Sequence, residues 1–454
     1  MAVIRSTRDM TQGRLGKQIL LFSVPLILSN LLQVFFNMAD IAVVGRFAGA
    51  AALGSVGSTA TLVTLFTGFL MGVGGGINVL VARAIGARDR DGVREYVHTA
   101  ALLSLLIGVA LGALGIVFTR PVLELLGTKA ELIDGAALYL HIYLLGVPAI
   151  SIYNFGHAVL SAAGDTRRPL LYLSISGAVN VLLNVLLVVG FHLDVAGVAI
   201  ASVVSLYLSA GLILAALFSE TETYALRLSH LRMNGRKARA LLALGIPGGL
   251  QNAIFAIANL FVQAGVNTFD AVVVEGNSAA MNSDPLVYDV MAAFYTACAS
   301  FMGQNLGAKK KDRILRSYLI ALAYSFGAGL LMGGTLVLFG RQFLSLFTTE
   351  AAVIEAGLGR LTVMGLSYCI SALMDCTIAA SRGLGKGFWP TVIVILGSCV
   401  FRVIWIYTIF AWMGTMESLY LLYACSWSLT GIAEIAYFAY VYRKTVRQLD
   451  AVRV

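Results

Sequence analysis

The sequence has few charged residues for its length. Only 12% of its 454 residues are Asp, Glu, Lys or Arg, whereas 59% are hydrophobic. A soluble domain carries about 25% charged residues, which keep its surface in water. The scarcity excludes an ordinary soluble enzyme and a disordered chain, and it predicts a polytopic membrane protein.

Cysteine is also scarce. The five cysteines are odd in number and show no Cys-x-x-Cys or Cys/His spacing, so the sequence predicts neither a disulfide framework nor a zinc site. We expect no bound metal and no cofactor. The polar, basic start is followed by an apolar run that is too long for a signal peptide, so no cleaved signal is expected.

Long apolar stretches take up most of the chain. A helix that crosses the bilayer core needs about 20 mostly apolar residues. Twelve stretches meet this length, and because they are continuous rather than alternating they predict helices and exclude a barrel. The stretch at 277–303 is the weakest, since it contains Asn282, Asp284, Pro285 and Asp289. The stretches lie near residues 18–44, 53–80, 96–119, 135–160, 169–191, 195–218, 240–268, 277–303, 317–340, 354–380, 389–412 and 418–441.

The 32 Lys and Arg residues divide unevenly between the two sides of these stretches. Both termini and every second loop together hold 26 of them, and Arg402 lies inside a stretch. The remaining five fall in the opposite loops: Arg46, Arg120, Lys129, Arg341 and Arg360. The positive-inside rule then places both termini of a multi-pass cell-membrane protein in the cytoplasm. The net charge of +9 is an orientation signal, and we expect no nucleic-acid partner.

The chain also repeats itself at a nearly constant offset, close to half its length. Pro25 matches Pro247, Asn37 matches Asn259, and Pro169 matches Pro390. We therefore predict two six-helix bundles, at 18–218 and 240–442, related by a pseudo-two-fold axis along the membrane normal. A cytoplasmic linker (219–239) joins them, and tails at 1–17 and 443–454 flank them. Repeats of this kind are typical of secondary transporters.

Several motifs resemble one transporter family. The first stretch reads SVPLILSNLLQVFFNMADIAVVG, the loops ARAIGARD and FMGQNLGAKKKDR follow stretches two and eight, and SAAGDTRRP pairs with SRGLGKGFWP. These motifs resemble the multidrug and toxic compound extrusion (MATE) family, part of the multidrug/oligosaccharidyl-lipid/polysaccharide exporter superfamily, over roughly residues 14–442. The resemblance implies an antiporter with twelve helices, driven by a proton or sodium gradient.

Polar residues inside the first stretch form one stripe. Asn30, Gln33, Asn37 and Asp40 fall within an arc of about 80° at about 100° per residue. An ionisable residue in a span costs about 2.5–3.5 kcal/mol and marks a functional candidate. We interpret the stripe as a cavity face with Asp40 as a proton acceptor; a polar seam between helices is the alternative.

The resemblance implies a cation-coupling network around Asp40. In the proton-coupled prokaryotic branch, a span-one Asp joins Asn residues of spans four and five and a span-five carboxylate, which Asp40, Asn154 and Asn180 match. Asn184 departs from the pattern, which has Asp there, so the two-carboxylate mechanism is in doubt and one carboxylate would couple one proton or bind sodium. His157 is a cavity candidate that would supply the missing titration, and a satisfied packing histidine is the alternative.

The second half repeats the stripe without its carboxylate. Asn252, Asn259 and Gln263 lie along the seventh stretch, whereas Phe255 stands near the Glu of sodium-type relatives and Ser371 where they carry Asp. A second-half cation site of that type is therefore doubtful. Asp284, Asp289 and Asp375 are candidates for binding cationic substrate, with helix capping as the alternative for the first two. For Arg402 and Glu434 we expect a mutual or backbone-paired structural role.

These observations favour an efflux antiporter for cationic or amphipathic small molecules, working as a monomer in membrane lipid. A flippase or exporter of a lipid-linked saccharide or other metabolite is the alternative, and a more cationic cavity would favour it. An enzyme is not expected, because HExxH, GxSxG and P-loop motifs are lacking.

Overall fold

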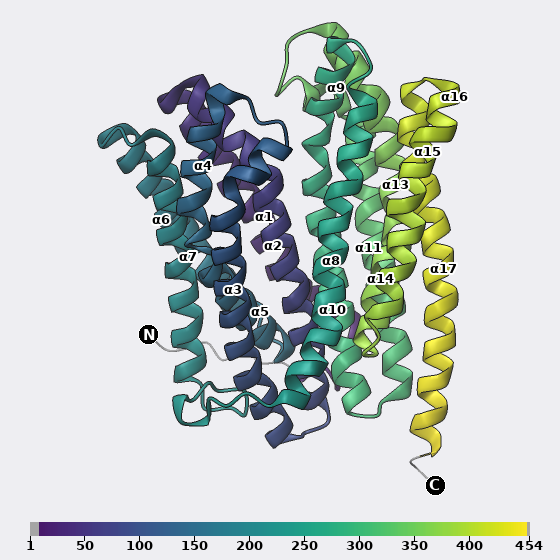
Figure 1. Ribbon diagram of the computed structural model, residues 1–454. Helices are drawn as coiled ribbons and strands as arrows, with labels where there is room; N and C mark the ends of the chain where they lie inside the picture. Colours follow the sequence, from purple (N-terminus) through teal and green to yellow (C-terminus); the bar gives the residue numbers. More distant parts are fainter. Residues whose placement is uncertain (1–8, 452–454) are drawn as a thin grey trace. The chain divides into compact units, whose positions relative to one another are not determined.

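The computed structural model describes residues 9–451, and every regular element in this range is helical (Figure 1). Residues 1–8 of the predicted N-terminal tail and 452–454 of the C-terminal tail lie outside the described residues. The first half contains α1 (Leu15–Val43), η1 (Val44–Ala48), α2 (Gly49–Gly86), α3 (Arg90–Leu125), α4 (Ala130–Leu144), α5 (Val147–Ala162), α6 (Arg167–Asn184), η2 (Val185–Gly190) and α7 (Asp194–Ser219), followed by the short η3 (Leu228–His230). The second half contains α8 (Gly235–Val266), α9 (Ala271–Met281), α10 (Ser283–Gly307), α11 (Lys311–Leu338), α12 (Gly340–Leu344), α13 (Ala351–Gly383), α14 (Phe388–Val394), η4 (Ile395–Val400), α15 (Phe401–Trp405), η5 (Ile406–Phe410), α16 (Ala411–Met413) and α17 (Met416–Ala451).

These helices form twelve membrane spans. Ten helical runs are long and apolar enough to cross a membrane, and the pair α4–α5, bent by 45°, makes eleven. One of the ten is the 72-residue run Leu15–Gly86, which as a straight helix would measure about 108 Å. The backbone leaves the helical region at Gly49 (φ 88°, ψ 174°), so α1 and α2 are separate spans. Each predicted stretch overlaps one span, and the all-α polytopic fold is confirmed.

The surface of the helices is apolar. Leu125 and Trp412 are each 85% exposed, and Val117 and Leu182 each 69%. Exposed side chains of this size are rarely clustered on a soluble protein, whereas lipid solvates them. The chain is a multi-pass membrane protein.

The two halves break their helices at matching positions. Arg88 (φ 57°) follows α2, and Lys309 (φ 55°), its counterpart in the repeat, follows α10. A non-glycine residue rarely adopts a positive φ. Gly164 (φ 87°) and Gly385 (φ 80°) form a second such pair at the same offset. The backbone therefore repeats where the sequence repeats.

Contacts divide the chain into two compact units. Unit 1 contains Leu28–Gly249, and unit 2 contains Met10–Ile27 and the chain from Leu250 onward. Helices α1 and α8 therefore each contribute to both units, and the repeat places the boundary in α8 at the position equivalent to that in α1. The predicted bundles at 18–218 and 240–442 are consecutive stretches, so they differ from these units at α1 and α8.

Glycines let α2 and α8 approach closely within unit 1. A β-carbon on Gly72 would lie 2.2 Å from the backbone nitrogen of Gly249, and one on Gly76 would lie 2.7 Å from that of Gly245. Glycines four residues apart on both helices form the small-residue packing that is common between membrane helices. No other residue type leaves room for this contact.

In unit 2 the segment Met10–Gly13 is bound by the end of α10 and the start of α11. The backbone N–H of Met10 donates to Oε1 of Gln304 at 3.2 Å, and Nδ2 of Asn305 donates to the Met10 carbonyl at 3.2 Å. The Arg313 guanidinium donates to the carbonyls of residues 10, 12 and 13 at 2.8–3.1 Å. The GQNLGA motif thus holds the start of the described chain.

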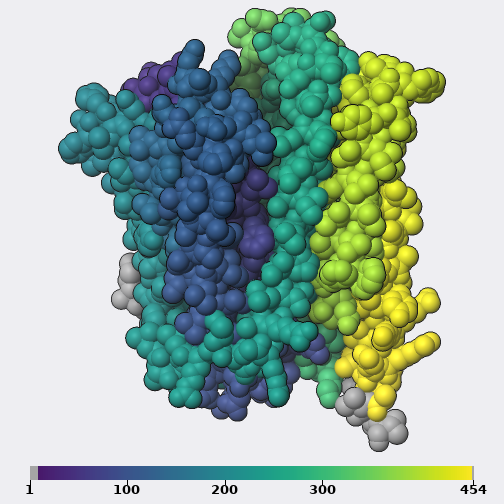
Figure 2. All heavy atoms as spheres, viewed as in Figure 1, coloured from purple at the N-terminus to yellow at the C-terminus, as the bar shows by residue number. Residues whose placement is uncertain are grey.

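Helix α17 packs along α13 and alongside the broken helix that runs from α14 to α16 (Figure 2). Gly397, in the π-helical η4, lies against Thr430 of α17, because a β-carbon there would be 2.5 Å from its Oγ1. The close contact brings the side chains of α15 next to those of α17.

Candidate functional site

The polar stripe of the first stretch lies on α1. Gln33 and Asn37 are exposed, while Asn30 and Asp40 are half-buried. Three of these residues are neutral amides, so Asp40 is the one that can take up or release a proton. Its position near the end of α1 brings it to the segment of α6 that carries Asn180 and Asn184.

Asp40 is held by an amide. Nδ2 of Asn184 donates to Oδ1 of Asp40 at 2.5 Å and also approaches Oδ1 of Asn180 at 3.3 Å. Asn184 is completely buried, and its own Oδ1 has no hydrogen-bond partner within residues 9–451. The sequence prediction that these three residues belong together agrees with this geometry; their role in ion coupling stays a prediction.

Both helices of this cluster change pitch directly after it. The π-helical η1 begins at Val44, four residues after Asp40, and the π-helical η2 begins at Val185, the residue after Asn184. π-helical turns are rare and occur frequently at functional sites, because the wider turn re-aims the side chains next to it. The sequences of these two segments do not predict the change.

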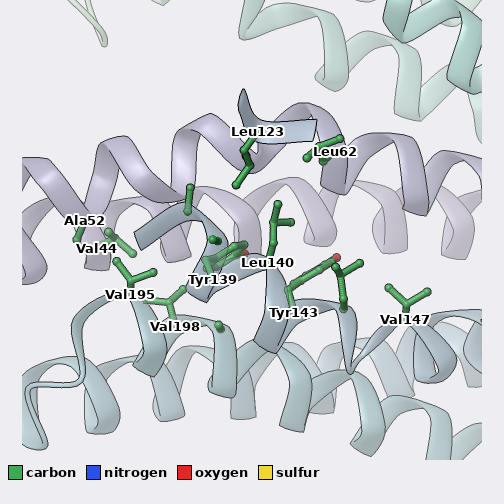
Figure 3. Close-up of a cluster of buried hydrophobic side chains, with 14 of the residues drawn as sticks. Val44, Ala52, Leu62, Leu123, Tyr139, Leu140, Tyr143, Val147, Val195 and Val198 are labelled. Carbon is green, nitrogen blue, oxygen red and sulfur yellow. The ribbon is translucent and has the colours of Figure 1, made fainter. Parts of the chain in front are cut away.

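Two tyrosines of α4 lie near Asp40. Tyr139 and Tyr143 lie within electrostatic range of its carboxylate, and their rings stack with centroids 5.8 Å apart. Both belong to the buried cluster of unit 1, together with Val44 and Val198 (Figure 3). The sequence analysis missed them. The signal that would have found them is their i, i+4 spacing on a span otherwise rich in aliphatic residues.

The two remaining first-half candidates lie on α5 and do not bond to this cluster in the described part of the chain. Nδ2 of Asn154 donates to the carbonyl of Ile150 at 3.0 Å, within its own helix. His157 stacks on Tyr153, with ring centroids 6.2 Å apart. The structure therefore places both on α5 and leaves their predicted roles as predictions.

The second-half stripe lies on α8. Asn252 and Asn259 are exposed, and Oδ1 of Asn259 accepts a hydrogen bond from Nη1 of Arg402 at 3.0 Å. Nε2 of Gln263 donates to Oδ1 of Asn267 at 2.8 Å. Asn259 therefore accepts a hydrogen bond from the buried Arg402, whereas the sequence predicted it as part of a cavity wall.

Asp284 forms a buried ion pair. Nη2 of Arg360 donates to its Oδ2 at 2.6 Å, and the Tyr368 hydroxyl donates to its Oδ1 at 2.5 Å. Assigning Arg360 to an outer loop was wrong: it lies inside α13 and is 2% exposed. Because its neighbour already balances its charge, Asp284 is less suited to bind a cationic substrate than the sequence suggested.

The remaining acidic candidates of unit 2 lie on three helices. Asp289 and Asp375 are half-buried on α10 and α13, and Glu434 is completely buried on α17. The expected mutual pair of Arg402 and Glu434 is not formed: Arg402 bonds to Asn259 and Ser426, and both carboxylate oxygens of Glu434 lack a hydrogen-bond partner within residues 9–451. The described residues also contain no cluster of three His, Cys, Asp or Glu side chains that could hold a metal ion.

The sequence model of the MatE family matches the chain twice, at residues 25–186 and 247–408. The chain belongs to the MatE family. The second match begins at Pro247, the counterpart of Pro25 where the first begins, which agrees with the internal repeat. As a MatE protein the chain is a transporter and not an enzyme, and both expectations from the motifs are confirmed.

Relatives and solved structures extend the comparison. The probable multidrug resistance protein YpnP of Bacillus subtilis is 27% identical over 89% of this chain and 91% of that protein. A FAD transporter of Shewanella oneidensis is 26% identical over 78% of each chain. The chain shares its fold with a MOP superfamily transporter of Pyrococcus furiosus, with a TM-score of 0.90 at 22% identity. The match covers 99% of this chain and 100% of the other. That structure is described with the words "reverse polarity of binding pocket suggests different function".

Proposed function

We propose that this MatE protein is a secondary active exporter of amphipathic organic compounds, cationic ones among them, and that inward proton flow drives it. The observation that carries the proposal is the bond between Asn184 and Asp40. A carboxylate inside a span costs about 2.5–3.5 kcal/mol, so one that is present there is a functional candidate. The Asn184 amide donates to this one, and no cation neutralises it among the ion pairs of residues 9–451.

The Asn184 amide suits a carboxyl group that changes its protonation state. The ionised carboxylate of Asp40 accepts from Nδ2, whereas a protonated carboxyl group needs an acceptor for its own hydrogen. The Oδ1 of Asn184, which has no partner within residues 9–451, supplies that acceptor when the amide rotates by half a turn. Proton uptake thereby reverses the direction of the bond and transmits the change to Asn180.

Sodium is the alternative coupling ion. The Asp40 carboxylate and the two amide oxygens of Asn180 and Asn184 are oxygen ligands, which hard cations prefer. The names of relatives such as the multidrug resistance protein of Bacillus subtilis support drug export as the activity. The charge distribution of the loops supports a cell-membrane location with both termini in the cytoplasm, and we propose that the working unit is a monomer.

A metabolite or lipid-linked saccharide is the second candidate cargo. The observation that favours it is Arg402, a buried cation without a contacting carboxylate within residues 9–451. The Shewanella oneidensis relative is named for a cargo, FAD, that carries phosphate groups. Both cargo classes fit the same exporter mechanism.

The test is efflux of a fluorescent cation, ethidium, from cells or proteoliposomes that hold the purified protein. A proton gradient and a sodium gradient are imposed separately, with an ionophore that collapses each as the control. We expect efflux to follow the proton gradient and to stop when it is collapsed. Efflux that follows only the sodium gradient would make sodium the coupling ion in place of the proton. Efflux that follows neither gradient overturns the proposal.

A further inference from the structure

Arg402 lies in the interior of unit 2, and the side chains that bond to it are neutral. It is 2% exposed, its Nη1 donates to Asn259 at 3.0 Å and its Nε to Oγ of Ser426 at 3.4 Å. The rings of Tyr423 and Phe255 lie 4.6 Å and 5.5 Å from the guanidinium carbon. A buried guanidinium is costly unless an anion pairs with it.

Two other arginines, the buried Arg360 and the half-buried Arg168, each pair with a carboxylate. Arg360 contacts Asp284 at 2.6 Å, and Arg168 contacts Glu220 at 2.9 Å. None of the ion pairs of residues 9–451 includes Arg402. Asp375 lies within electrostatic range of both Arg382 and Arg402 but forms no ion pair with Arg402.

The repeat places Arg402 at an informative position. The offset between Pro169 and Pro390 is one residue shorter than the offset between the two ends of the family match, at 186 and 408. The π-helical η4 lies between these points, and a π turn holds one residue more than an α turn. Arg402 therefore corresponds to Asn180 of unit 1, and its partner Asn259 corresponds to Asn37.

The cluster around Asn180 and the one around its counterpart Arg402 thus carry opposite charges. The first half has the Asp40 carboxylate held through Asn184 and Asn180, and the second has the Arg402 guanidinium held by Asn259. Helix α15, which carries Arg402, is five residues long and lies between the π segments η4 and η5. π segments occur frequently at functional sites, and two of them flank the short helix that carries Arg402.

We infer that unit 2 contains a recognition site for an acidic group, carboxylate or phosphate, of the exported compound, and that Arg402 binds this group. The inference rests on the proposed export function and names its substrate class. The planar guanidinium matches both anions with two parallel hydrogen bonds. The acidic oxygen takes the place of Oδ1 of Asn259, which is a neutral acceptor on an exposed residue.

The rings beside Arg402 narrow the class further. Tyr423 and Phe255 are half-buried and lie against the guanidinium. An aromatic compound with an acidic group would contact the rings with its flat body while the acid reaches Arg402. A compound that also carries an amine fits the same description, so the inference is compatible with amphipathic cargo that has both charges.

The experiment measures binding by fluorescence to the purified full-length protein in lipid nanodiscs, without any gradient. Two matched pairs of probes isolate the charge: a xanthene dye with a free carboxylate against its methyl ester, and riboflavin phosphate against riboflavin. We expect the acidic member to bind about tenfold more tightly or better in at least one pair, as a charge-assisted contact requires. The pair that shows the preference tells carboxylate from phosphate.

Variants then assign the preference to Arg402. Arg402→Gln should abolish it, and Arg402→Lys should retain part of it. Asn259→Asp keeps Arg402 but gives it a carboxylate partner, so this variant should abolish the preference as well. It keeps the test decisive if Arg402→Gln does not fold. Arg341→Gln removes an exposed arginine of the same unit and should change nothing.

Equal affinity for the acid and its neutral partner in both pairs overturns the inference, and so does a preference that survives both Arg402→Gln and Asn259→Asp. Binding without a gradient is separate from transport. A charge preference without gradient-driven efflux would sink the exporter proposal alone, and efflux without a preference would sink the anion site alone.

Discussion

The side-chain amide of Asn184 donates to the carboxylate of Asp40 across 144 residues of sequence. Its own oxygen is left without a hydrogen-bond partner in the described chain. A donor–acceptor group beside a single carboxyl group provides two hydrogen-bond patterns, one for each protonation state. In the proposed mechanism, Asn184 takes the place of the acidic residue that the family pattern has at this position.

Replacing Asp40 with Asn should abolish transport driven by a proton gradient while the protein stays folded, because the amide has the same shape but takes up no proton. Proton release on addition of substrate to proteoliposomes is the measurement. Asp134→Asn is the control, since Asp134 is exposed and pairs with Arg120 on the surface. Transport at the wild-type rate in Asp40→Asn would make Asp40 structural and our mechanism wrong.

Replacing Asn184 with Leu should reduce proton-driven transport by about tenfold, because losing a hydrogen bond to a charged group costs on the order of 1.5–3 kcal/mol. Asn180→Leu should reduce it less, since Asn180 reaches Asp40 through its bond with Asn184. Initial rates at several pH values give the comparison. The reverse order of the two variants would show that Asn180 is the coupling amide.

Replacing Gly72 with Ala should lower stability by about 1–3 kcal/mol, the usual cost of overpacking. The added carbon would lie 2.2 Å from the backbone of Gly249, which cannot rotate away. Gly75→Ala is the matched control, because nothing lies within 4 Å of a β-carbon there. Thermal unfolding of both variants in the same detergent tests this, and equal melting temperatures would contradict the close packing of α2 on α8.

Glu220 should make stability depend on pH. Burial alone would raise its pKa, but hydrogen bonds from Arg168 (2.9 Å) and the Thr221 N–H (3.2 Å) outweigh burial and hold the pKa below its usual value. A lowered folded-state pKa stabilises the protein at pH values above the unfolded pKa, which is about 4.3, and the gain is lost as pH falls through the folded value. Melting temperatures of the wild type and Glu220→Gln should differ at pH 7 and converge in acid; a constant difference would refute the linkage.

The sequence was sufficient to predict the spans, because hydropathy and the positive-inside rule act on local stretches. It also located the weakness at 277–303: α9 ends at Met281 and α10 begins at Ser283, with Pro285 in its first turn. Bilayer thickness sets the length of each span, and proline and polar residues mark the breaks. Neither property requires knowledge of a distant part of the chain.

The partners of the buried charged residues could not be predicted from the sequence. Arg360 reaches Asp284 from 76 residues away, and Arg402 reaches Asn259 from 143 residues away, in each case between two different helices. The rotation of each helix about its own axis decides which side chains face each other. A π segment such as η4 adds one residue to a turn and so changes which residues face the neighbouring helix. Periodicity assumes a constant turn, so it could not give the register of Arg402.

The bond between Met10 and Gln304 joins residues 294 positions apart. At about 5–20 residues per second, a ribosome needs roughly 15–60 s to make the chain between them. The segment 10–13 therefore lacks these binding partners while most of the protein is synthesised. Its hydrogen bonds to α10 and α11 can form only after the start of α11 has been made. Deleting that segment would consequently destabilise unit 2, most of which is synthesised last.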